Sequence, residues 1–252
     1  MDEKQREEYL KNSEVNQKLL KLFESKWGIV EKVCNAIKNK ELKIVLHLAC
    51  VPPNYEKMKY KILIVGQEND GWEMEDNARL SMFATLDFLD SKDYNDIRPF
   101  FSFPYKFCKS INNLGNIQDS KKTYFTWVNL KAFSFDKKPK MPLNKEAQDI
   151  IDNEFNILEE EIKIINPDIV LFLTGQKYDE YIKKQLKGVQ YYNVENYDTE
   201  DFARLEHPIL KNKKAFRIHH PRAFSSKYLI ERLNRRHLYN EFLNKLLEEC
   251  QK

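Results

Sequence analysis

The sequence lacks the cysteine spacing that is typical of metal centres. Its four cysteines, spread over 252 residues, never form a Cys-x-x-Cys pair. Zinc or iron–sulfur ligation is therefore disfavoured, and we expect no metal and no cofactor. Scattered buried thiols are typical of a protein in the reducing cytosol. The cysteines are Cys34, Cys50, Cys108 and Cys250.

Long hydrophobic runs are also missing. The longest aliphatic stretch has the length of one strand, whereas a membrane helix needs roughly 20 apolar residues. Residues 1–8 are mostly charged and contain no apolar core of a signal peptide. We therefore expect no membrane contact and a cytoplasmic location.

The chain has little excess charge of either sign. Its formal net charge is +3 and its pI is near 8.4, so nucleic-acid binding would depend on a local patch. A hydrophobic content of 42% with 13% aromatic residues excludes general disorder. The length suits one large α/β domain, which we expect to be monomeric.

Short apolar runs that end at glycine or a polar turn recur along the chain and predict buried strands. The clearest run, Ile62–Val65, stops at Gly66, and similar runs occupy 124–128, 168–174 and 215–218. Helical patterns alternate with these runs. The alternation predicts a three-layer α/β/α sandwich with a short, mainly parallel four-stranded sheet.

The helices are predicted from apolar residues at spacings of three and four. One amphipathic helix is expected over 151–165, ending at Asn166-Pro167. Residues 190–214 read as irregular, and the segment 44–48 fits either a helix end or a strand. Other helices are expected at 78–89, 100–114, 178–186 and from 228 to the C-terminus.

The N-terminal segment is predicted to be a helical extension, residues 1–55, packed on a core domain of residues 56–252. Leu19, Phe23, Trp27 and Val30 recur at helical spacing, and Val51-Pro-Pro-Asn then breaks the pattern. We expect a single domain overall.

Polar side chains follow three of the predicted strands. Glu68 comes after the first, Asn129 after the second and His220 after the last. Parallel strands bring these positions to one edge of the sheet, where ligands bind in α/β proteins. A carboxylate, a carboxamide and an imidazole together suit cleavage of a bond to a planar, hydrogen-bonding leaving group.

Three short motifs in this order resemble the uracil-DNA glycosylase superfamily, over roughly residues 60–245. Gly66-Gln67-Glu68-Asn69-Asp70-Gly71 corresponds to the family's Gly-Gln-Asp-Pro-Tyr-His after a buried strand. Trp127-Val128-Asn129 corresponds to a strand that ends in a base-reading asparagine. His220-Pro221-Arg222-Ala223-Phe224-Ser225 corresponds to His-Pro-Ser-Pro-Leu-Ser.

The resemblance implies hydrolysis of the N-glycosidic bond of a deaminated or damaged base in DNA. Glu68 would orient the attacking water and stabilise the sugar cation. His220 would donate a hydrogen bond to the departing base. Gln67 and Asn129 would bind the base edge, since a carboxamide offers both a donor and an acceptor.

The resemblance also implies contacts that flip the base out of the duplex. Phe83 would be the aromatic platform for the base, with Trp72 and Phe103 as alternatives. Phe224 stands where the family places an apolar wedge. Ser225 would contact DNA beside it, and basic residues around the third motif would bind phosphates. These are Lys211, Lys213, Lys214, Arg217, Arg222, Lys227 and Arg232.

The first motif departs from the family at Asn69, in place of proline, and at Asp70, in place of the tyrosine that excludes thymine. The preferred base is therefore not predicted. A catalytically altered member that binds nucleic acid or a nucleobase-like ligand is a second hypothesis, and a hydrolase of free nucleosides is a third. Each residue also has a structural reading: Glu68 as a helix cap, Asn129 as a turn residue and His220 as part of a loop. His219 is an alternative to His220 as the functional histidine.

Overall fold

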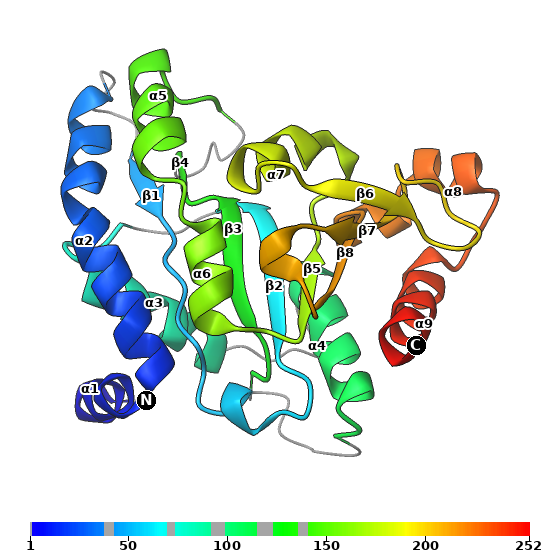
Figure 1. Cartoon of the computed structure of the whole chain (residues 1–252), viewed down its shortest axis with the longest axis horizontal. Helices are drawn as coiled ribbons and strands as arrows, with labels where there is room; N and C mark the ends of the chain where they lie inside the picture. The colour runs from blue at the N-terminus through cyan, green and yellow to red at the C-terminus, as the bar shows by residue number, and fades with distance from the viewer. Residues whose placement is uncertain (1, 38–42, 70–73, 92–98, 115–122, 136–140) are drawn as a thin grey trace.

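The computed structural model describes residues 2–37, 43–69, 74–91, 99–114, 123–135 and 141–252, and its centre is a six-stranded sheet (Figure 1). The strand order is β3-β2-β5-β8-β7-β6. The first four strands are parallel and the last two are antiparallel. The chain is thus an α/β protein with a mainly parallel sheet. The bounds are β2 Ile62–Glu68, β3 Thr126–Lys131, β5 Ile169–Phe172, β6 Gln190–Asn193, β7 Phe202–Glu206 and β8 Lys214–Ile218.

Helices cover both faces of the sheet because the side chains of the strands alternate between two apolar cores. Leu63 and Val65 belong to a core shared with helices α2, α3, α5, α6 and α7. Ile62 and Ile64 belong to a second core, shared with α4, α8 and α9. The helices are α1 Glu3–Asn12, α2 Glu14–Ala36, α3 Ala78–Ser91, α4 Pro99–Ile111, α5 Lys145–Glu154, α6 Leu158–Ile165, α7 Asp179–Gln185, α8 Lys227–Leu233 and α9 Leu238–Gln251, with short 3-10 turns η1 Tyr55–Lys57, η2 Gln176–Tyr178, η3 Pro208–Leu210 and η4 Pro221–Ser225.

Helix α2 is fixed to the following segment by a buried side chain. The Asn16 carboxamide accepts a hydrogen bond from Val51 N–H at 2.8 Å and donates one to Val51 C=O at 3.0 Å. Leu19 and Phe23 are buried in the same core as β2. The ambiguous segment 44–48 contains a strand, β1 (Ile44–Leu46), which pairs antiparallel with β4 (Phe133–Phe135).

Two expectations about the sheet and its helices were wrong. The central sheet has six strands instead of four, because residues 190–214 contain β6 and β7. The edge strand β6 exposes polar side chains and so carries no apolar signal. The helix expected over 151–165 is two helices, because the chain breaks at 155–157, where Phe155 and Ile157 are both buried.

The C-terminal helix is also divided. Asn234 adopts a left-handed conformation (φ 52°) and ends α8, and α9 begins four residues later. Asn166 (φ 46°) ends α6 in the same way, one residue before Pro167. Within the described ranges, no helix combines the length and hydropathy that a membrane span requires.

Candidate functional site

The carboxyl ends of β2 and β5 form the centre of the candidate site. In the sheet, β3 lies on one side of β2 and β5 lies on the other, so the chain reverses its direction across the sheet after β3. Strand order reverses at this point, which is where open α/β sheets form a ligand crevice. Gln67 is the second-last residue of β2, and its side-chain N–H donates to the Thr174 carbonyl beyond β5 at 2.7 Å.

Asn129 lies directly beside Gly66 across the parallel pair of β2 and β3. Its Oδ1 accepts a hydrogen bond from Trp127 Nε1 at 2.9 Å, and its Nδ2 donates to Asn69 Oδ1. A Cβ atom on residue 66 would lie 2.3 Å from Asn129 Oδ1 and 2.9 Å from the Phe100 ring. Glycine is therefore required at position 66 for this close approach.

His220 is oriented by the turn that it begins. Its Nδ1 accepts the backbone N–H of Arg222 at 3.2 Å, at the start of η4. An accepting Nδ1 leaves the proton of the neutral ring on Nε2, so the imidazole can donate from that atom. The ring stacks on Phe100, with centroids 5.3 Å apart and planes inclined by 17°. Phe100 thus joins the surroundings of Asn129 to those of His220.

The Glu68 carboxylate accepts a hydrogen bond from the Tyr178 hydroxyl. Burial and this carboxylate raise the pKa of Tyr178 well above its usual value, so the phenol remains a donor. The Lys131 ammonium lies over the Tyr178 ring, 5.8 Å from its centroid. Glu68 is not among the residues that line the cavity described next.

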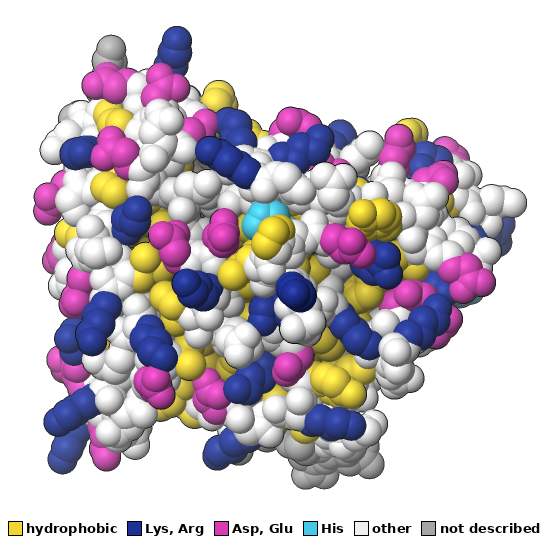
Figure 2. Space-filling model, viewed as in Figure 1, with side chains coloured by type: hydrophobic (Ala, Val, Ile, Leu, Met, Phe, Trp, Pro, Cys, Tyr) yellow, Lys and Arg dark blue, Asp and Glu magenta, His cyan; other side chains and the backbone are white. Residues whose placement is uncertain are grey.

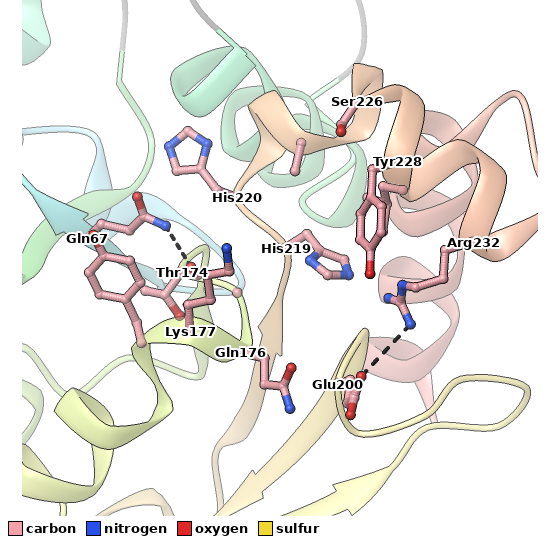
Figure 3. Close-up of a pocket in the computed structure, with 14 residues that line it drawn as sticks. Gln67, Thr174, Gln176, Lys177, Glu200, His219, His220, Ser226, Tyr228 and Arg232 are labelled. Carbon is pink, nitrogen blue, oxygen red and sulfur yellow. Dashed lines mark hydrogen bonds and ion pairs between the residues drawn. The ribbon is translucent and has the colours of Figure 1, made fainter. Parts of the chain in front are cut away.

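A cavity of about 520 Å³ opens beside His220, between the end of β5 and helix α8 (Figure 3). Gln67 and His220 both line it, whereas Asn129 and Phe100 do not. Its other lining residues come from the 174–178 turn, the β6–β7 connection, the residue that follows β8 and the segment 223–232; they are Thr174, Gly175, Gln176, Lys177, Tyr178, Glu200, His219, Ala223, Ser226, Tyr228, Leu229 and Arg232.

His219 also faces this cavity but has a different partner. Its Nε2 lies 2.8 Å from Oδ1 of the buried Asp201, which also pairs with Arg232. Burial, with the nearby Arg217 guanidinium, lowers the pKa of His219 to about 4. The ring is therefore neutral near pH 7 and donates from Nε2 to the carboxylate, which leaves Nδ1 as an acceptor.

Two aromatic residues predicted to contact DNA are buried in the apolar cores of the protein. Phe83 is 5% exposed in the core beside α2, with the Arg6 guanidinium over its ring, and does not line the cavity. Phe224 is 5% exposed and packs against Phe103 and Phe242. Neither ring is presented as a base platform or a wedge, since each is held in an apolar core.

The expected basic cluster is divided among three locations. Lys213 and Lys214 lie near the amino end of β8, where they bond to Pro167 and Cys250 carbonyls. Arg217 is 1% exposed and pairs with Asp179 inside the protein. Lys211 follows η3, and the remaining members, Arg222, Lys227 and Arg232, lie on η4 and α8 beside the candidate site, together with Ser225.

The residues of η4 and α8 beside the candidate site form few hydrogen bonds or ion pairs with one another. Arg222 and Ser225 are exposed, and the Ser225 hydroxyl donates to the Arg222 carbonyl at 3.1 Å. The Lys227 side chain is 88% exposed, with Glu231 at 3.5 Å. These residues are therefore accessible to a ligand. Asp70 and Trp72, named from the first motif, lie outside the described residues.

The candidate site thus brings together Gln67, Asn129 and His220 but turns the Glu68 carboxylate toward Tyr178. Sequence reasoning missed Phe100, whose stacking on His220 depends on where α4 lies relative to η4. Its only sequence signal was membership of the aromatic stretch 100–107. No family model matches the chain, and no match was found among curated proteins.

Proposed function

We propose that the protein is a uracil-DNA glycosylase-like hydrolase, which releases a deaminated or damaged base from DNA. The observation that carries this proposal is the position of Asn129 and His220 near the Phe100 ring, with Gln67 lining the cavity beside His220. Two carboxamides and an imidazole that donates from Nε2 are suited to bind the edge of a uracil-like base and to stabilise its anion as it leaves.

Phe100 is the aromatic residue best placed to stack on the base. Its ring lies against both Gly66 and His220, and Asn129 beneath this contact is only 7% exposed. Binding of a base edge to Asn129 therefore requires the Phe100 ring to move aside. Once displaced, the same ring is close enough to stack on the incoming base.

Glu68 supplies the carboxylate that the reaction requires, and the hydrogen bond from Tyr178 determines how this carboxylate is oriented. Hydrolysis of an N-glycosidic bond develops positive charge on the sugar, which a carboxylate stabilises while it orients water. In this structure the Tyr178 hydroxyl donates to the Glu68 carboxylate. Catalysis therefore requires that Glu68 exchange this hydrogen bond for one from the attacking water, or accept one from the water in addition.

A non-catalytic protein that binds a nucleobase in DNA is the second candidate. The Glu68–Tyr178 hydrogen bond favours it, since a carboxylate that remains tied to a phenol does not act on a sugar. Both candidates use Asn129 and His220 for the base. They differ in whether a base is released.

The test is a gel assay on fluorescent oligonucleotides with one uracil or hypoxanthine, single- and double-stranded, with alkaline cleavage of abasic products. Glu68→Gln, Asn129→Ala and His220→Ala should each slow base release by roughly 10²–10³-fold. Glu24→Gln and His237→Ala are matched controls at exposed positions on α2 and before α9, and should leave the rate unchanged.

Base release that all three site variants leave intact would exclude the assigned site. If no base is released but lesion-containing DNA binds, and Asn129→Ala weakens that binding, the second candidate replaces the first. A folded protein that neither binds nor cleaves these oligonucleotides excludes both.

A further inference from the structure

The cavity beside His220 contains a buried polar atom with no partner within the described part of the chain. Thr174 is 2% exposed, and its hydroxyl oxygen makes no hydrogen bond. Leaving a buried hydroxyl unpaired costs about 1–3 kcal/mol. Because Thr174 lines the cavity, its hydroxyl, which has almost no accessible surface in this structure, can bond to a ligand once neighbouring side chains shift.

The inner wall of the cavity also presents an acceptor and has little unpaired positive charge. His219 is held by Asp201, so its other ring nitrogen, Nδ1, is an acceptor. Arg232 pairs with Asp201 and lies 4.0 Å from Glu200. Since the Arg232 charge is balanced and the His219 ring is neutral, the interior suits an uncharged polar group better than a phosphate.

An aromatic ring stands at the rim of this cavity. Tyr228, from α8, is 73% exposed, the largest fraction among the exposed large hydrophobic side chains of the described residues. Figure 3 shows it beside His219 and Arg232, with Gln67 and His220 further along the cavity. An exposed aromatic face is a stacking platform for an unpaired nucleobase.

Cationic side chains adjoin the lining residues in the chain. Arg222 precedes the lining residue Ala223, Lys227 lies between Ser226 and Tyr228, and both are exposed; Lys177 lines the cavity itself. A nucleotide with its base inside would leave its phosphates near these residues. The volume of about 520 Å³ is within the range of pockets for ligands of this size.

On the premise of the proposed function, we infer that this cavity holds the base of the nucleotide next to the excised one, in single-stranded DNA. The base stacks on Tyr228 and bonds to Thr174 Oγ1 and His219 Nδ1. It thus requires both an N–H donor and an acceptor on one edge. A neighbouring base that is paired in a duplex cannot reach Tyr228, so single strands are the preferred substrate.

The first experiment measures binding without catalysis. Fluorescence anisotropy of an unmodified single-stranded 12-mer is compared for the wild type, Tyr228→Ala and Thr174→Val. Both changes should weaken binding, Tyr228→Ala by at least about fivefold. Thr174→Val removes an unpaired hydroxyl at nearly constant volume, so its unfolding temperature should not fall. Tyr192→Ala, at a tyrosine 42% exposed on β6 and outside the cavity, is the matched control and should change binding less than twofold.

The second experiment places an abasic residue on either side of a uracil in the same strand. Loss of the base that occupies the cavity should weaken wild-type binding and remove the effect of Tyr228→Ala, because the two changes delete one contact. An effect of Tyr228→Ala that equals that of Tyr192→Ala, or that persists with both neighbours abasic, overturns the inference.

The two proposals fail separately. Base release with no dependence on Tyr228 excludes the neighbouring-base subsite and leaves the glycosylase proposal standing. Tyr228-dependent binding of single strands with no base release keeps the cavity as a site for an unpaired base and excludes the glycosylase. Tighter binding of duplex than of single strands also overturns the subsite.

Discussion

Replacing Arg217 by methionine tests whether this arginine has a structural role in the fold or binds phosphate. Its side chain is 1% exposed and pairs with both carboxylate oxygens of Asp179 at 3.0 Å. It also donates to the Glu200 carbonyl at 2.7 Å and to the Thr199 carbonyl. One buried guanidinium therefore joins β8, α7 and the turn before β7.

The expected loss follows from what Arg217→Met leaves behind. Asp179 keeps a partly buried carboxylate without its cation, and two carbonyls lose their donor. Removing one partner of a buried ion pair costs about 3–5 kcal/mol. For a chain of this size, that loss lowers the unfolding temperature by roughly 6–20 °C. Burial already raises the pKa of Asp179, which the arginine opposes, so the variant should also favour the protonated acid.

The assay is thermal and urea unfolding followed by circular dichroism, beside DNA-binding anisotropy at several salt concentrations. Arg204→Met is the matched control, because Arg204 on the neighbouring strand forms an exposed pair with Glu206 at 3.1 Å. An exposed pair contributes about 0–1 kcal/mol. If Arg217→Met unfolds like the wild type but reduces the salt dependence of DNA binding, the structural role is refuted.

Three further changes test other parts of the structure. Gly66→Ala should abolish base release and cost about 1–3 kcal/mol, because its Cβ would lie 2.3 Å from Asn129 Oδ1; activity and unfolding assays check both. Burial raises the pKa of Glu161 to about 8, so the free energy of unfolding should fall as pH rises from about 4.5 to 8; Glu161→Gln should remove this fall in urea titrations at several pH values. Phe224→Ala should destabilise the fold by about 3–5 kcal/mol in the same titrations, whereas a wedge residue would lose DNA binding at unchanged stability.

The strands of the parallel sheet were predictable because each is a short apolar run that ends abruptly. Ile62–Val65 and Ile169–Phe172 are buried on both faces, so their composition alone distinguishes them from the helices around them. The edge strand β6 was missed because most of its side chains are exposed. The strand β7, which lies between β8 and β6, was missed because its apolar residues Phe202, Ala203 and Leu205 are interrupted by charged ones and form no continuous apolar run. The break between α5 and α6 was missed because both helices keep the same apolar spacing.

Site residues on the strand ends were easier to predict than the contacts that orient them. Strand order alone brings Gln67 and Asn129 to one edge, although β2 and β3 continue to Glu68 and Lys131, three residues past the apolar runs that predicted their ends. The hydroxyl that holds Glu68 belongs to Tyr178, 110 residues further along the chain. The burial of Phe224 and Arg217 depends in the same way on packing between distant elements, which one sequence does not encode as a local pattern.

The adjacent residues His219 and His220 show how the structure assigns different chemistry to identical side chains. Figure 3 shows the two rings pointing in different directions from the end of β8. The Arg222 N–H at Nδ1 leaves His220 a donor at Nε2, whereas Asp201 at Nε2 leaves His219 an acceptor at Nδ1. A departing base anion needs a donor, so His220 alone has the polarity that the proposed reaction requires. An N–H of a neighbouring base needs an acceptor, and His219 supplies it. The two histidines are therefore not interchangeable, although the sequence His-His-Pro gives no indication of which one acts.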